Sequence, residues 1–173
     1  MGLATFIGGI HPFEGKELSE DKPIKYLEPL QGEVMVYPLS QHIGAPAKPL
    51  VAKGDHVLKG QIIAEAGGFI SANVLSSVSG TVKGIESKLV ANGAMVQSIL
   101  VENDGEEEAI EGFGTDRDAS KLSKEEIRQI VKDAGIVGLG GAGFPTHVKL
   151  SPKEPDKIDH ILVNGAECEP YIT

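Results

Sequence analysis

The segment GLGGAGFPTHVK, residues 138–149, combines residue types that can bind an anionic or planar ligand. Four of its first six residues are glycines: Gly138, Gly140, Gly141 and Gly143. Successive glycines let backbone N–H groups converge on an anion, and they let bare backbone lie against a planar ring. Phe144 can add an aromatic face, and Pro145 can begin a helix. Thr146 and Lys149 would then lie near a phosphate, with Lys149 as the cation.

The spacing alone leaves a ligand cradle and a glycine hinge as equal alternatives. The segment formally satisfies G-x-G-x-x-G, but the dinucleotide-binding form of that motif needs a strand immediately before it. Here the pattern before the loop predicts a helix. A Walker A loop is excluded, because no Gly-Lys-Ser/Thr follows the glycines.

The elements on either side of the loop are predicted by local signals. Ser123 and Glu126 have the spacing of a capping box, and apolar residues then recur at helical intervals up to Ala134. Gly135 occupies the position of a left-handed helix cap. After the loop, residues 159–164 are expected to form a strand of a buried parallel sheet.

Ligands of open α/β sheets bind at the carboxyl ends of strands, which makes Asn164 and Glu169 candidate binding residues. Cys168 lies between two glutamates that disfavour a thiolate, so it is assigned no catalytic role. The histidines have no metal-ligand spacing, and no metal site is predicted.

Residues 26–105 are predicted to be β-rich. Short apolar runs bounded by turn residues predict strands at 34–37, 61–64, 81–85 and 96–101. The stretches VAKGDHVLKGQIIAE and SSVSGTVKGI resemble a biotinyl- or lipoyl-like barrel-sandwich hybrid. The hairpin between them, AGGFISANVL, has no lysine to modify, so a carrier role is not favoured.

The expected fold class is therefore β followed by α/β. The four expected parts are an extended arm at 1–25, a barrel-sandwich hybrid at 26–105, an acidic linker at 106–120 and the start of an α/β domain at 121–173. Because the chain ends soon after that last domain begins, it is expected to be an amino-terminal fragment.

Composition narrows the class of protein further. A formal charge of −9 makes non-specific binding to nucleic acid unfavourable, and no nucleic-acid partner is expected. A single cysteine allows no internal disulfide and no cysteine cluster for zinc or iron–sulfur. No signal peptide or membrane-spanning run is recognised, so a soluble cytoplasmic chain is expected.

The pair GLGGAGFPTHVKL and NGAECEPYIT resembles the flavin-binding signature of the flavoprotein subunit of respiratory complex I. The chain departs from that signature at four positions: Leu139, His147, Ala166 and Cys168. With these departures, GGIHP at residues 8–12 and the β module before the loop, the chain is similar to the RnfC family of the Rnf electron-transport complex.

The resemblance implies a subunit that handles FMN and NAD(H) in an ion-translocating ferredoxin:NAD oxidoreductase. The implied partners are the other Rnf subunits and, indirectly, ferredoxin, and the implied location is the cytoplasmic face of the membrane. Two 4Fe–4S clusters would belong to a carboxy-terminal region that this chain lacks. The cofactor supplies the chemistry, so no catalytic side chain is named.

The resemblance also implies roles for individual residues. Gly138, Gly140, Gly141 and Gly143 would approach FMN. Lys149 and Asn164 would contact its phosphate or ribityl region, and Phe144 and Glu169 would line the nicotinamide side. The isolated 173-residue chain is expected to bind FMN weakly or not at all. The alternative function is a non-enzymatic docking module for the partners in the complex.

Overall fold

The computed structural model describes residues 15–18, 20–23 and 25–165. The chain divides into two compact units. One unit, Glu28–Pro155, contains every β-strand and both α-helices of the described residues. The other unit comprises Met1–Leu27 and Asp156–Thr173, and its described part includes the short helix η1 (Lys16–Leu18).

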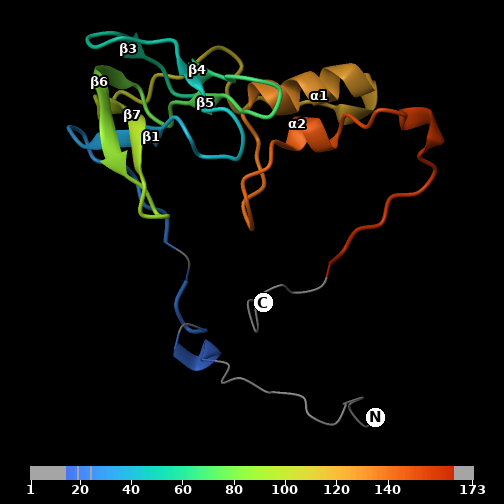
Figure 1. The fold of residues 1–173 in the computed structure, drawn as a ribbon. Helices are drawn as coiled ribbons and strands as arrows, with labels where there is room; N and C mark the ends of the chain where they lie inside the picture. The colour runs from blue at the N-terminus through green and yellow to red at the C-terminus, as the bar shows by residue number, and fades with distance from the viewer. Residues whose placement is uncertain (1–14, 19, 24, 166–173) are drawn as a thin grey trace. The chain divides into compact units, whose positions relative to one another are not determined.

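Two antiparallel sheets make up the β module of the Glu28–Pro155 unit (Figure 1). The order in the first sheet is β1 (Val34–Pro38), β7 (Met95–Asn103), β6 (Gly80–Leu89) and β3 (His56–Val57). The order in the second is β2 (Lys48–Pro49), β4 (Ile62–Glu65) and β5 (Val74–Leu75). All four strands predicted from apolar runs are confirmed, as β1, β4, β6 and β7.

The core lies inside this β module and draws side chains from both sheets. Ile99 and Val101 come from β7, Ile63 comes from β4 and Val57 comes from β3, and all four are fully buried. Burying each such aliphatic side chain stabilises the fold by about 1.5–3 kcal/mol. Because short strands bounded by turns supply these residues, the module is held together mainly by contacts between distant parts of the chain.

The segment that follows β7 is fastened to the β module. The amide of Lys59 donates to the carbonyl of Glu108 at 2.8 Å, and the amide of Ile110 donates to the carbonyl of Lys59 at 3.0 Å. A Cβ at Gly60 would lie 2.5 Å from the ring of Phe113, so the chain also packs closely there. The first part of the acidic stretch expected at 106–120 is thus bound to the barrel by its backbone.

Asp104 anchors the start of that segment. Its carboxylate accepts hydrogen bonds from the hydroxyl of Ser79 at 2.7 Å and the amide of Glu106 at 2.9 Å, and Nε2 of His56 lies 2.9 Å away. The Ser79 hydroxyl, followed by the Glu106 amide and His56, lowers the pKa of Asp104 from 3.8 to about 2. The charged carboxylate is therefore the form that the fold stabilises.

This shift predicts an acid-dependent loss of stability. The contribution of Asp104 is present above its unfolded pKa of 3.8 and disappears as the pH falls towards its folded pKa of about 2. Asp104→Asn cannot ionise, so we expect its unfolding free energy to depend less steeply on pH between those two values. Denaturant unfolding at a series of pH values measures both slopes, and equal slopes would contradict the prediction.

Helix α1 (Lys124–Asp133) begins and ends as the sequence predicts. Ser123 accepts from the amide of Glu126, and the Glu126 carboxylate accepts from the amide of Ser123, which completes the capping box. At the other end Gly135 has a φ of +63°. The amide of Ile136 donates to the carbonyl of Val131 at 3.3 Å and that of Gly135 to Lys132 at 3.0 Å, which is a Schellman motif.

The strand predicted at 159–164 is wrong. Residues 158–165 form neither helix nor strand, and Leu162 is 96% exposed. A strand needs a neighbour for its backbone hydrogen bonds, and no described residue forms a β-ladder or β-bridge with this segment. Its apolar composition indicated burial, but composition supplies no partner.

None of the helices in the described part of the chain has both the length and the apolar composition needed to cross a bilayer.

Candidate functional site

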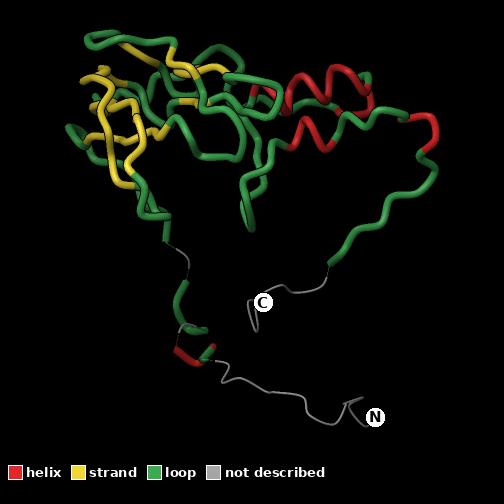
Figure 2. The backbone as a smooth tube through the Cα atoms, in the orientation of Figure 1, coloured by secondary structure: helices red, strands yellow, loops and turns green. Residues whose placement is uncertain are grey.

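The glycine loop, residues 138–143, connects α1 to the short helix α2 (Thr146–Lys149) and is closed at its base. The amide of Gly138 donates to the carbonyl of Phe144 at 3.0 Å, and the amide of Thr146 donates to the carbonyl of Ile136 at 3.0 Å. Val137 and Pro145 form a β-bridge between these two bonds. Figure 2 shows loop backbone from one helix to the other. In the described residues the glycine loop therefore joins two helices, and it is not a hinge between a helix and a strand.

Pro145 is placed one position earlier than expected. It is the N-cap of α2 with a φ of −59°, rather than the first helical residue. Pro145 is fully buried, so it fixes the direction in which the chain leaves the glycine loop.

The glycines of the loop fall into two groups. Gly143 has a φ of +65°, and a Cβ there would lie 3.0 Å from the carbonyl oxygen of Gln41 and from Cα of His42. The fold itself therefore requires glycine at 143. At Gly140 and Gly141 the φ is not positive and a Cβ would meet nothing within 4 Å. Gly138 has only ordinary contacts, the closest at 3.8 Å. The described fold gives no reason for glycine at these three positions.

A cation and an aromatic ring lie beside the loop. Nζ of Lys149 is 5.8 Å from the centroid of the Phe144 ring, which is within the range of a cation–π contact. The same ammonium lies 4.0 Å from the position that a Cβ at Gly138 would take. The single turn of α2 thus places the ammonium of Lys149 next to Gly138, at the base of the glycine loop.

His147, on the same turn of helix, adds no comparable charge. Burial, and then the positive charge of Lys132, lower the pKa of His147 below its ordinary value of 6.5. The imidazole is therefore mainly neutral at pH 7, and Lys149 is the residue of α2 that can neutralise an anion.

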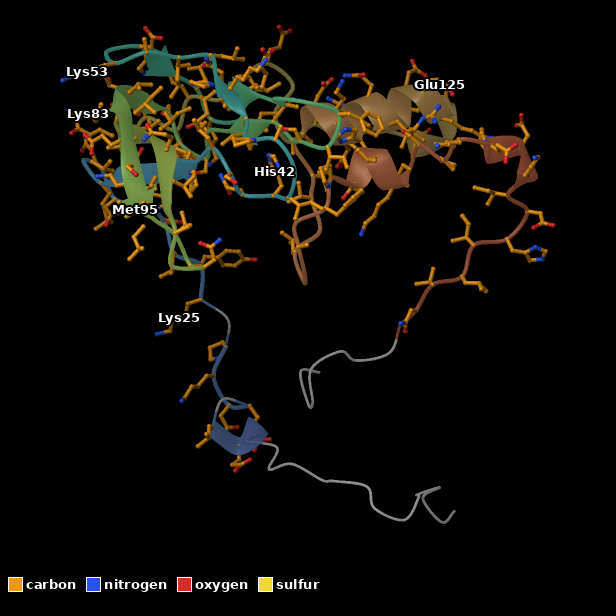
Figure 3. The ribbon with its side chains drawn as sticks, viewed as in Figure 1. Lys25, His42, Lys53, Lys83, Met95 and Glu125 are labelled. Atoms are coloured by element: carbon orange, nitrogen blue, oxygen red, sulfur yellow. The ribbon has the colours of Figure 1, made fainter. Side chains whose placement is uncertain are left out.

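Two loops of the β module, residues 41–46 and 66–73, are hydrogen-bonded to each other, and we refer to them together as the platform. They contact the chain at Gly135, before the glycine loop, and at Gly143, its last residue. The hydroxyl of Ser71 donates to the carbonyl of Ala45 at 2.8 Å, and the amide of Ala45 donates to the carbonyl of Ile70 at 3.0 Å. Nε2 of His42 accepts from the amide of Ala72 at 3.2 Å, so Nδ1 carries the proton that is shared with the Ile43 carbonyl. Figure 3 labels His42 on this platform.

A cavity of about 280 Å³ lies where the platform meets the end of α1. Its lining includes Gln41, His42 and Asn73 from the platform and Gly135 and Val137 from the chain after α1. Sequence reasoning missed this contribution of the β module. Local patterns contain no signal for it, because the residues that meet are separated by sixty or more positions in the chain.

The structure thus brings together the four glycines, Phe144 and Lys149 of the predicted site. Asn164 lies on the exposed segment after Asp156, which belongs to the other unit. Glu169, Cys168 and Ala166 lie outside the described residues. Among the residues that are described, no group of three or more metal-ligating side chains is close enough to hold an ion.

Two family profiles match the chain. The profile described as the RnfC barrel sandwich hybrid domain matches residues 4–106, and the profile described as the Nuo51 FMN-binding domain matches residues 131–173. Together they confirm the predicted fold class, a barrel-sandwich hybrid followed by the start of an FMN-binding domain. The glycine loop and Lys149 both fall in the FMN-binding match.

Curated relatives align with almost the whole chain. It is 46% identical over 171 residues to the C subunit of a proton-translocating ferredoxin:NAD(+) oxidoreductase complex from Clostridium ljungdahlii, covering 99% of this chain and 37% of that protein. It is 45% identical over 172 residues to the C subunit of a Na(+)-translocating complex of the same kind from Acetobacterium woodii, covering 98% and 38%.

A third relative is the C subunit of an ion-translocating oxidoreductase complex from Haemophilus influenzae. It is 41% identical over 173 residues, covering 99% of this chain and 26% of that protein. The chain thus spans about a quarter to two fifths of the length of these relatives.

Proposed function

Since this chain belongs to the RnfC family, we propose that it provides part of the flavin-handling subunit of an ion-translocating ferredoxin:NAD oxidoreductase. The observation that carries the proposal is the contrast between glycines. Gly143 is required by the fold, whereas Gly140 and Gly141 have open space around them. Where no contact within the fold requires a glycine, the missing side chain leaves room for a ligand to approach the backbone closely.

The residues present fit FMN. The tip of the glycine loop offers backbone to a planar ring, and Lys149 places an ammonium at its base where a phosphate can be neutralised. Phe144 would line the nicotinamide side. We further propose that Asn164 and Glu169 complete the site, with Asn164 near the FMN phosphate or ribityl chain and Glu169 near the nicotinamide.

When bound, FMN supplies the hydride and electron transfer between NAD(H) and the rest of the complex. This chain's residues bind the cofactor, neutralise its phosphate and keep water from the reacting face.

We also propose the cytoplasmic face of the membrane as its location, the other Rnf subunits as its partners, and two 4Fe–4S clusters in the further length of the protein. The proposed domain bounds are 1–25, 26–105, 106–120 and 121–173.

A docking module is the second candidate function, and one surface favours it. The β6–β7 hairpin extends beyond the core, and Leu89 and Met95 are paired near its tip. Their exposed fractions are 71% and 62%. Apolar side chains exposed side by side are typical of contact surfaces for partner proteins.

The first test is quenching of flavin fluorescence by protein. We expect a version extended to the length of the relatives to quench FMN, and the 173-residue chain to quench it weakly or not at all. Saturable, tight binding by the short chain would overturn the second expectation. If neither protein quenches, the flavin proposal fails and the docking function is favoured.

Riboflavin, which lacks the phosphate, makes the test specific to Lys149. In the extended protein FMN should bind more tightly than riboflavin. Lys149→Gln should remove much of that preference, because a single phosphate–ammonium contact contributes on the order of 1–3 kcal/mol. An unchanged preference would show that the phosphate lies elsewhere.

A further inference from the structure

We propose that Asn73 is a positioning residue that fixes the glycine loop on the β module. The proposal rests on the proposed flavin site and extends it to a residue far away in the sequence. Asn73 lies in the hairpin of the barrel-sandwich where a carrier domain would present its lysine. In this chain the hairpin at residues 66–75 contacts the carboxyl end of helix α1.

The side chain of Asn73 bridges the two parts. Its Oδ1 accepts from the amide of Ala66 at 2.9 Å, which orients the amide group. Its Nδ2 then faces the carbonyls of Lys132 and Asp133 at 3.4 and 3.5 Å. Carbonyls in the last turn of a helix lack partners within the helix. The Lys132 carbonyl already accepts from the amide of Gly135, and the Asn73 side chain adds a donor from the β module to it and to the Asp133 carbonyl.

The backbone of Asn73 makes a second contact with the same helix end. A Cβ at Gly135 would lie 2.4 Å from the carbonyl oxygen of Asn73 and 3.0 Å from Cδ1 of Leu75. Only a glycine permits that approach. The chain is therefore held against the platform at Gly135, three residues before the loop begins at Gly138.

The loop returns to the platform at its other end. Gly143 is buried against the backbone of Gln41 and His42. The ring of His42, in turn, accepts from the amide of Ala72, the residue next to Asn73. Both ends of the glycine loop thus rest on one hydrogen-bonded platform, while Leu139 at the tip is 97% exposed.

The test compares Asn73→Ala and Asn73→Asp with Asn92→Ala. Asp at 73 keeps an acceptor for the Ala66 amide, removes the donor to the helix and places a negative charge against the helix carbonyls, so its effect should be at least as large as that of Asn73→Ala. It serves if Asn73→Ala fails to fold. Asn92 is the matched control, because its side chain also binds a backbone amide, that of Ala94 at 3.0 Å, but in the distant β6–β7 turn.

Two readouts are measured on the extended protein. Without flavin, hydrogen exchange at the amides of Gly138 and Thr146 should be faster in both Asn73 variants, with core amides of the β module unchanged. FMN affinity should fall by about tenfold, the equivalent of one lost hydrogen bond. Asn92→Ala should change neither readout.

The outcomes separate the two proposals. If the parent protein does not bind FMN, the proposed function fails, and the exchange measurement still decides the role of Asn73. If FMN binds and the Asn73 variants match the parent in exchange and affinity, the positioning role is overturned. Loss of affinity together with loss of the β-module protection would also overturn it, because that would be general unfolding.

Discussion

Gly135→Ala is expected to lower the free energy of unfolding by about 2–4 kcal/mol. An alanine at a φ of +63° is strained by about 1–2 kcal/mol. Its Cβ would in addition lie 2.4 Å from the carbonyl oxygen of Asn73, a contact that the backbone must relieve by moving. Denaturant unfolding of parent and variant measures the difference.

Gly93→Ala separates the two causes. Gly93 has a φ of +82°, and a Cβ there would meet nothing within 4 Å, so only the backbone strain applies. We expect Gly93→Ala to cost about 1–2 kcal/mol. If Gly135→Ala costs no more than this, the end of α1 is not packed against Asn73 as described.

Gly141→Val should weaken FMN binding by at least about 100-fold, or roughly 2.7 kcal/mol, in the extended protein. A Cβ at Gly141 would meet nothing within 4 Å, so we expect the free chain to accommodate the larger side chain. Thermal unfolding without flavin should therefore be nearly unchanged, within about 0.5 kcal/mol. A cofactor that lies against the loop would meet the new methyl groups directly.

The series Gly, Ala and Val at 141 gives the expected dependence on size, with Ala intermediate. Ala91→Val introduces the same side chain on an exposed turn of the β6–β7 hairpin and should bind FMN as the parent does. If Gly141→Val binds FMN normally, the glycines at the tip have another purpose and the cradle proposal fails.

Local signals in the sequence were sufficient for individual elements. The capping box at Ser123 and the glycine at 135 set both ends of α1, because each acts through hydrogen bonds within a few residues. Turn residues around short apolar runs likewise placed β1, β4, β6 and β7. The position of such an element is determined by residues within it or next to it in the sequence.

Features that depend on distant partners were not predictable in this way. The strand expected at 159–164 failed, because an apolar run does not reveal whether a neighbouring strand exists. Asn73 contacts Asp133 across sixty residues, and the pairing of Lys59 with Glu108 spans a similar distance. The glycine motif was enough to identify the loop. The contacts that position it come from distant residues of the β module and are seen only in the structure.

The closed base of the glycine loop has an entropic consequence. The two backbone hydrogen bonds of one β-bridge join its ends, so the freedom of those ends is already lost when the chain folds. A ligand that arrives later needs to order only the few residues at the tip. Preorganisation of this kind raises affinity without adding any contact to the ligand. Variants that open the base should therefore weaken binding through a less favourable entropy of association.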